Sequence, residues 1–212
     1  MESYHVISGL KIKGTEIVSV LNDKPIFVYQ GSADGACGPY SLFITLMILG
    51  KISYDNLPPN HKEDNRTGAT KFFKKIKNMK GLVVDGTTLR KLKKLVVDSF
   101  PSKLKVEECP YKNADIITYV IEKLKQDIPT ITGILYQGGG GHWMVSVGYC
   151  CDENKKPTKL LFLDPGSKEP TIAPWNTYIE IAKKKKGDYP YHWNTNGYNI
   201  SFDEALSLSI IK

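Results

Sequence analysis

Cys37 is the residue of this chain best suited to act as a nucleophile. It stands before Gly-Pro-Tyr-Ser and the almost continuously apolar run 42–49. Pro39 suits a first helical turn and Gly50 suits a C-terminal cap, so the sequence predicts a helix that begins at Cys37 and is buried on all sides. A helix N-terminus stabilises a thiolate, which is the reactive form of cysteine. Small neighbours would let a substrate backbone approach the sulfur, namely Gly35, Ala36 and Gly38.

His142 is the candidate general base. It follows four glycines, residues 138–141, and opens a predicted strand over residues 142–150. Side chains alternate along that strand, so His142 points away from the bulky apolar face that begins with Trp143. Glycines before the histidine make the backbone mobile or let a substrate approach it closely, as a substrate cleft needs. Taken alone, such a histidine also fits a structural role at a strand end.

Asp164 is the candidate that would orient the histidine. It closes a predicted strand, 159–164, just before Pro165. A hairpin register that sets His142 opposite Asp164 centres its turn at residue 153, and residues 152–157 have turn composition. Directly opposed Cβ atoms are about 4.5–5.5 Å apart, within reach of a carboxylate and an imidazole. The alternative interpretation is an Asp-Pro-Gly turn without a catalytic part.

Gln30 is the candidate oxyanion donor. It ends a predicted strand, Ile26 to Gln30, and the glycine-bearing loop 31–36 separates it from Cys37. That loop can fold the side-chain amide back beside the Cys37 backbone N–H, a pairing that stabilises the oxyanion of acyl transfer. A glutamine at a strand end is equally compatible with a surface residue that has no role.

The remaining histidines and cysteines make weaker candidates. His192 is the rival base, whereas His5 lies near the terminus and His61 in the polar loop 57–64. The spacing of the four cysteines predicts neither a disulfide ladder nor a zinc site. Three of them are interpreted as packing residues, namely Cys109, Cys150 and Cys151.

Helical patterns precede strand patterns along the chain. Amphipathic helices are predicted near residues 70–79, from Thr87 or Thr88 to about 99, and over 114–126. Strands are predicted at 130–136, 142–150, 159–164 and 205–211. This segregation favours an α+β layout in one domain, residues 1–212, with a helical subregion of about 37–127 and a sheet subregion of about 128–212.

Composition and charge limit the kinds of molecule that the chain is expected to bind. The chain has 212 residues, of which 41% are apolar, and 29 Lys and Arg against 22 Asp and Glu give it a charge of +7. The excess lies mainly in residues 71–105 and in the lysine run 183–186. Because the first stretch has helical apolar spacing, its lysines are expected to form a solvated face, and nucleic acid is an unlikely partner. The oligomeric state stays open.

No secretory signal is recognisable, and the longest apolar stretch, residues 41–50, falls short of the roughly 20 residues of a membrane helix. We therefore expect no membrane span, and either a cytoplasmic location or delivery to a cytosol without a signal peptide. The abundance of Lys, Asn, Ile and Tyr would suit a bacterial effector or toxin.

Four motifs in this order resemble the papain-like cysteine peptidases, most closely the C39-type bacteriocin-processing peptidases. They are Gln30, Gly35-Ala-Cys-Gly-Pro-Tyr-Ser41, Gly141-His-Trp-Met-Val-Ser-Val-Gly148 and Leu163-Asp-Pro-Gly166. The resemblance implies a papain-like fold, in which an N-terminal helical part with a buried nucleophile helix packs on a C-terminal antiparallel sheet. It also implies a thiolate–imidazolium pair of Cys37 and His142, with Asp164 on the other ring nitrogen and Gln30 as oxyanion donor. Residues 50–105 and the tail from Trp175 have no counterpart in a minimal domain of that family, so the substrate stays open.

The expected activity is that of a cysteine peptidase. It would act on a peptide or isopeptide bond through an acyl-enzyme, with a protein or peptide as substrate and no metal or cofactor. A thiol acyltransferase or deamidase would use the same nucleophile and base. A catalytically silent module that binds a peptide or protein is the third possibility.

Overall fold

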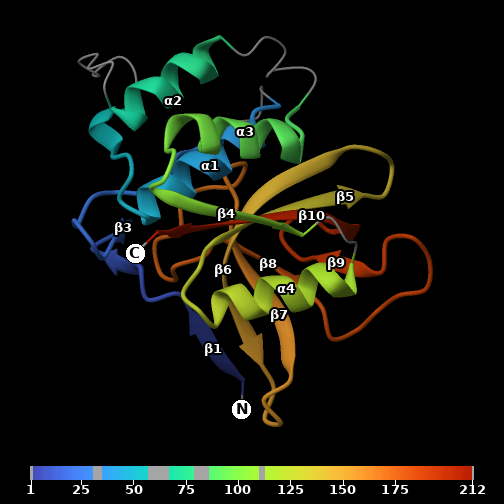
Figure 1. The fold of residues 1–212 in the computed structure, drawn as a ribbon. Coiled ribbons are helices and arrows are strands. Elements are labelled where there is room, and N and C mark those ends of the chain that lie inside the picture. Colours follow the sequence, from blue (N-terminus) through green and yellow to red (C-terminus); the bar gives the residue numbers. More distant parts are fainter. Residues whose placement is uncertain (1, 31–34, 57–66, 79–85, 110–112, 212) are drawn as a thin grey trace.

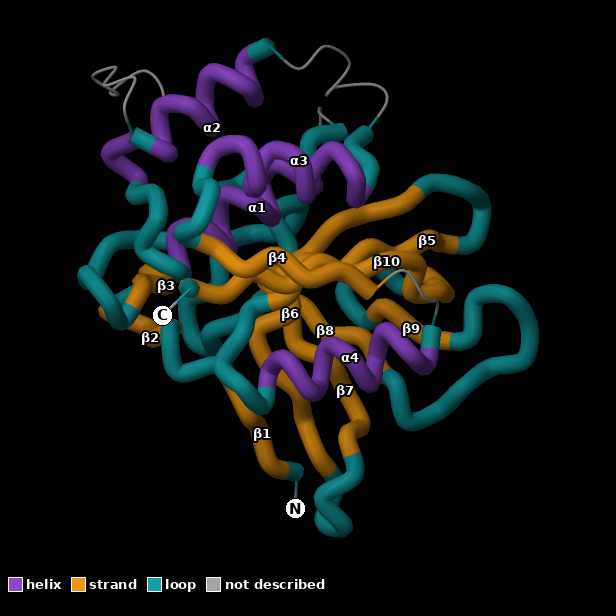
Figure 2. The backbone as a smooth tube through the Cα atoms, in the orientation of Figure 1, coloured by secondary structure: helices purple, strands orange, loops and turns teal. Residues whose placement is uncertain are grey.

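A closed ring of six antiparallel strands forms the centre of the computed structural model, which describes residues 2–30, 35–56, 67–78, 86–109 and 113–211. Around the ring the strands run β6–β5–β10–β9–β8–β7, and β7 pairs with β6 to close it. These strands, orange in Figure 2, are β5 (Thr130–Tyr136), β6 (Gly141–Cys151), β7 (Pro157–Leu163), β8 (Thr177–Glu180), β9 (Tyr191–Trp193) and β10 (Tyr198–Ile210).

Two more strands extend this sheet, and a small hairpin stands apart from it. β1 (Ser3–Val6) pairs with β6, and β4 (Leu104–Cys109) pairs with β10. The hairpin consists of β2 (Leu10–Lys13) and β3 (Glu16–Ser19). The described residues thus contain strands before, between and after the helices.

The papain-like α+β layout expected from the sequence is therefore wrong. The predicted helical subregion contains β4, and the sheet does not lie beside it as an open layer but closes into a six-stranded barrel. Closure depends on β10, which is 13 residues long and pairs with β4, β5 and β9. Its register against β5 shifts between Phe202 and Glu204, and such bulges add the bend that a closed sheet needs.

The predicted strand Ile26 to Gln30 is also wrong. Its two ends bond to different parts of the chain, because Ile26 N–H donates to the Ile17 carbonyl (3.1 Å) and Gln30 N–H donates to the Pro165 carbonyl (2.8 Å). Just before it, Pro25 forms an isolated bridge with Val18. Ile26 and Phe27 are buried in the core. The apolar pattern of the segment therefore reflects burial and not membership of a β-sheet.

The predicted helices are confirmed with small shifts at their ends. They are α1 (Cys37–Ile48), α2 (Gly68–Lys77), α3 (Leu89–Ser99) and α4 (Ala114–Leu124), with a 3₁₀ turn, η1, at Tyr54–Asn56. Thr88 proves to be the N-cap of α3, since its hydroxyl accepts a hydrogen bond from the Lys91 N–H (3.4 Å). The predicted loop 57–64 and most of the loop 31–36 lie outside the described residues.

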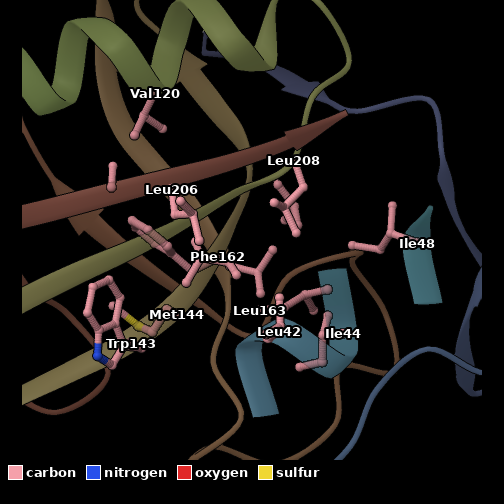
Figure 3. Packing of buried hydrophobic residues seen from close by; sticks show 14 of the residues in the cluster. Leu42, Ile44, Ile48, Val120, Trp143, Met144, Phe162, Leu163, Leu206 and Leu208 are labelled. Carbon is pink, nitrogen blue, oxygen red and sulfur yellow. The ribbon is translucent and has the colours of Figure 1, made fainter. Parts of the chain in front are cut away.

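The core joins α1 to the barrel. Every residue of α1 except Tyr40 is buried, as predicted for this helix. Figure 3 shows its side chains Leu42 and Ile44 in the same group of buried residues as Leu163. In Figure 1, α2 and α3 lie above α1, and α4 crosses the strands on the other side of β4 and β10. None of the helices in the described ranges has the length and apolar character that crossing a membrane requires.

Candidate active site

Helix α1 carries Cys37 as its first residue and is tied to the strand that carries His142. The Ser41 hydroxyl donates a hydrogen bond to the Trp143 carbonyl (3.0 Å), one residue from the histidine. The Trp143 indole N–H in turn donates to the Thr87 carbonyl (2.8 Å). These two bonds hold the start of α1, the start of β6 and the segment before α3 together.

The glycine run before His142 forms the turn between β5 and β6. Gly138, Gly139 and Gly140 have φ values of 100°, 97° and 100°, a backbone region that only glycine adopts readily. A Cβ on Gly140 would come within 2.6 Å of the Tyr136 hydroxyl oxygen. The Tyr136 side chain thus lies directly against the backbone of this run. The conformation of the run determines where β6 begins.

His142 and Asp164 are in direct contact. The Nε2 atom of His142 lies 2.6 Å from Oδ1 of Asp164. Strands β6 and β7 pair antiparallel as predicted, but the predicted register is wrong by two residues. Val145 opposes Leu163, so the same register continued would set Asp164 opposite Met144 and not His142.

The physical cause of this offset is the turn between the strands. Asp152 N–H donates to the Lys156 carbonyl (3.0 Å), which centres the turn on residue 154 instead of 153. Because side chains alternate with a period of two, a two-residue offset leaves His142 and Asp164 on the same side of the sheet. Diagonal neighbours start about 7–8 Å apart and can still meet through their side chains.

Asp164 is almost fully buried, and neighbouring donors keep it ionised. Oδ1 accepts a hydrogen bond from the Gly166 N–H (2.8 Å), and Oδ2 accepts one from the Ser167 hydroxyl (2.7 Å). Burial by itself would raise the pKa of Asp164, but the hydrogen bond and charge of His142, with the donors of Ser167 and Gly166, lower it below its usual value. The carboxylate is therefore available to the ring.

Asn176 fixes the backbone of this aspartate. Its side-chain Oδ1 accepts a hydrogen bond from the Asp164 N–H (2.7 Å), while its Nδ2 donates to the Asp164 carbonyl (2.9 Å). The same Nδ2 also donates to the Lys168 carbonyl (3.0 Å). A single amide side chain thus clamps both ends of the turn that holds the carboxylate.

The environment of His142 favours its charged form. Burial opposes the charge, but the hydrogen bond to Asp164 and the interaction with the Cys37 side chain raise the pKa of His142 to about 9. The Trp193 ring stacks on the imidazole, with centroids 5.5 Å apart and planes at 19°. At neutral pH the ring is therefore an imidazolium, the form that stabilises a neighbouring thiolate.

A cleft of about 690 Å³ brings the predicted site residues together. Cys37, His142 and Gln30 all line it, and Asp164 lies behind His142. Gln30 is positioned next to the aspartate turn by its backbone bond to Pro165. The other walls come from the segment before α3, from β5 and from β10, including Thr87, Thr88, Tyr136, Asp203 and Glu204.

The rival candidates lie elsewhere. His192 belongs to β9 and is not among the residues that line this cleft, while His5 stacks on Tyr149 with centroids 4.8 Å apart. His61 lies outside the described residues. The packing role of the other cysteines is confirmed, because Cys109, Cys150 and Cys151 are all buried, with free thiols. Burial raises the pKa of Cys150 and of Cys151.

Several contributors to the site were not found from the sequence. Ser167 directly follows the Asp-Pro-Gly turn. Serine hydroxyls often form hydrogen bonds within turns, and this tendency could have indicated that Ser167 bonds to Asp164. Asn176 and Trp193 lie in the tail that has no counterpart in the resembling family, and no spacing pointed to them. This tail supplies β8, β9 and β10 as well as two side chains that contact Asp164 and His142.

No model of a known protein family matches the chain, and no curated protein matches it. Support for a function therefore comes from the geometry of the site. A thiol at a helix N-terminus and an imidazolium that share one cleft, with a buried carboxylate bonded to the ring, are suited to acyl transfer through a covalent thioester.

Proposed function

We propose that this protein is a cysteine peptidase that hydrolyses a peptide or isopeptide bond. The observation that carries the proposal is the common cleft, in which Cys37 begins α1 and His142 is held 2.6 Å from the Asp164 carboxylate. The order of the motifs, similar to that of the C39-type peptidases, supports the same chemistry.

In the proposed reaction the Cys37 thiolate attacks the carbonyl carbon of the substrate. The Cys37 backbone N–H and the Gln30 side-chain amide donate hydrogen bonds to the oxyanion. The His142 imidazolium gives its proton to the departing amine, and a thioester remains on Cys37. Water, deprotonated by His142, then attacks the thioester and releases the acid and the thiolate. An amine acceptor in place of water would make the same site a transferase.

Selective alkylation tests the activated thiolate. Iodoacetamide at pH 6 should modify Cys37 well ahead of the three packing cysteines, because an ordinary thiol, with a pKa of about 8.5, is then almost entirely protonated. Peptide mapping by mass spectrometry identifies the modified residue. Equally slow modification of all four cysteines would favour a silent binding module.

Turnover tests the peptidase itself. Incubation with a peptide library prepared from a cell lysate should generate new peptide termini, detected by mass spectrometry. Cys37→Ala should abolish them while the fold persists, since the change removes a single sulfur atom. Cys109→Ala, which removes a buried thiol outside the cleft, is the matched control and should retain the activity. New termini in the Cys37→Ala digest at the wild-type rate would contradict the assignment.

A further inference from the structure

Helices α2 and α3 carry the whole positive surplus of this chain. Their residues include eight Lys and Arg but a single acidic residue, Asp98, which is a surplus of seven. The complete chain has a net charge of +7, so the charges of its other residues balance one another. A charge concentrated in two neighbouring helices produces a local positive potential, which attracts an acidic partner.

The cationic side chains of the two helices form one surface. Helix α2 packs against α3 (Figure 1), and the Asp98 carboxylate forms ion pairs with Lys75 of α2 (2.7 Å) and Lys94 of α3 (3.2 Å). One carboxylate thus joins the lysines of both helices. We call this region the cationic surface, and its exposed members are Lys71, Lys74, Lys77, Arg90, Lys91 and Lys94.

Arg90 and Lys91 lie where the cationic surface borders the active-site cleft. They come just after Thr87 and Thr88, which line the cleft together with Cys37. Within the described ranges neither of the two cations forms an ion pair. Both stand in the first turn of α3, which contains no acidic residue. Cations at the positive end of a helix oppose its stability, so this arrangement breaks a local rule, as functional surfaces often do.

The side chains of the cationic surface favour a polypeptide over a membrane or a nucleic acid. Phe72 and Phe73 of α2 are buried, so this helix has no apolar face left to insert into a lipid surface. Within residues 68–77 and 89–99 the only exposed large apolar side chain is Val97, and no exposed aromatic ring is present there to stack on the bases of a single strand. The surface instead lies beside the cleft of the proposed peptidase, which a polypeptide substrate must enter.

We propose that the cationic surface binds an acidic segment of the polypeptide substrate, close in sequence to the bond that Cys37 attacks. The inference rests on the proposed function, and it names the substrate class. Helix α3 has 11 residues and is therefore about 16 Å long, a length that an extended chain covers with about five residues. Acidic residues within about five to ten positions of the scissile bond therefore reach Arg90, Lys91 and the lysines beyond them.

The decisive variant combines Arg90→Gln with Lys91→Gln, which removes two charges and keeps two good helix formers. Its melting temperature should equal that of the wild type or exceed it, because cations are removed from the positive end of α3. The matched control combines Lys183→Gln with Lys186→Gln. It removes two exposed lysines that belong to neither helix and do not line the cleft.

The peptide library from a cell lysate measures the preference directly. For each peptide, mass spectrometry gives the rate at which new termini form and the number of Asp and Glu residues near the cleaved bond. The wild type should cleave peptides with acidic flanks faster than peptides with neutral flanks, and added salt should weaken this preference. The variant at Arg90 and Lys91 should cleave acidic-flanked peptides about fivefold more slowly, as expected for two lost surface ion pairs, and neutral-flanked peptides at the wild-type rate. The control variant should keep the full preference.

Three results would overturn the inference. The wild type could cleave acidic-flanked and neutral-flanked peptides equally fast. The variant at Arg90 and Lys91 could lose melting temperature and cleave both classes more slowly, which is the behaviour of a structural region. Finally, the wild type but not this variant could bind vesicles of phosphatidylcholine and phosphatidylserine, or a single-stranded DNA oligonucleotide, with no preference among peptides. A wild-type digest without new termini would instead contradict the proposed function, on which this inference rests.

Discussion

Nε2 of His142 and Oδ1 of Asp164 lie 2.6 Å apart although their strands pair two residues away from the register that would set them directly opposite. The offset leaves Asp164 just beyond the last residue of β7, at the start of a turn. From there its carboxylate reaches the donors of Gly166 and Ser167, which a residue within the strand ladder would not meet. The pair therefore combines an imidazole on a strand with a carboxylate on a turn.

Substitution of Asp164 should give a graded loss of turnover. In Asp164→Asn the amide oxygen can still accept from His142 and Gly166, and the amide N–H can donate to the Ser167 hydroxyl oxygen, so the geometry survives while the charge is lost. We expect this variant to keep more activity than Cys37→Ala. Asp164→Ala should be worse, because three donors then lose their partner. Measured kcat values check the order, and equal activity of both variants with the wild type would reduce the triad to a Cys–His dyad.

Loss of the imidazole should be visible in the thiol. In His142→Ala the alkylation of Cys37 by iodoacetamide at pH 6 should slow by at least tenfold, because its imidazolium partner is gone. The rate at pH 9.5, where free thiols ionise on their own, should change much less. His192→Ala is the control and should alkylate as the wild type does. Wild-type alkylation of His142→Ala at pH 6 would mean that another group activates Cys37.

Asn176 should affect stability and turnover because it holds the backbone of Asp164 in place. Asn176→Ala removes the amide that bonds both the N–H and the carbonyl of Asp164, and we expect a loss of unfolding free energy of about 1–3 kcal/mol together with reduced kcat. Urea denaturation and turnover measure the two effects. Asn199→Ala removes an exposed amide, bonded to Gln137 and Lys185, and should affect neither by a comparable amount. A kcat unchanged in Asn176→Ala would show that the turn holds its shape without the clamp.

Stability should depend on alkaline pH through His142. Folding raises the pKa of His142 to about 9, above the value near 6.5 of an unfolded histidine. The charged ring therefore stabilises the fold fully below about pH 6.5, and this contribution is lost as pH rises through about 9. Urea denaturation from pH 6 to 10 should show this loss in the wild type and a flatter profile in His142→Gln. Parallel profiles would mean that the ring is not held in its charged form.

The Asp164 carboxylate contributes to stability with the opposite pH dependence. Because the pKa of Asp164 is lowered in the folded state, its stabilisation is present above the ordinary value of about 3.9 and is lost as acid protonates it. Between about pH 5 and 6 both contributions to stability are therefore fully present.

Local signals were sufficient for the parts of the site that lie within one element. Pro39 and Gly50 predicted the limits of α1, and the strand pattern of residues 130–136 matches β5 as the structure has it. The turn chemistry of residues 152–157 predicted the pairing of β6 with β7 but not the register, which differs because the turn centres one residue later.

What the sequence did not predict depends on distant partners. Strands β8 and β9 have only four and three residues, too few for alternation to mark them. The bulge near Asp203 that helps β10 close the ring has no local signature. Thr87 was considered only as a possible cap, since its contact with Gly38 and its backbone bond to Trp143 depend on segments elsewhere in the chain. A closed sheet is determined by pairings that no window of sequence contains.

The order in which the ring is completed has a consequence during synthesis. The thiol, the imidazole and the carboxylate all leave the ribosome before β10, the strand that fills the gap between β5 and β9. Trp193, which stacks on the imidazole, also emerges late. Translation adds about 5–20 residues per second, so a chain that carries all three reacting groups waits seconds for its last strand. We therefore expect the candidate site to be incomplete until β10 has left the ribosome and paired with β5 and β9.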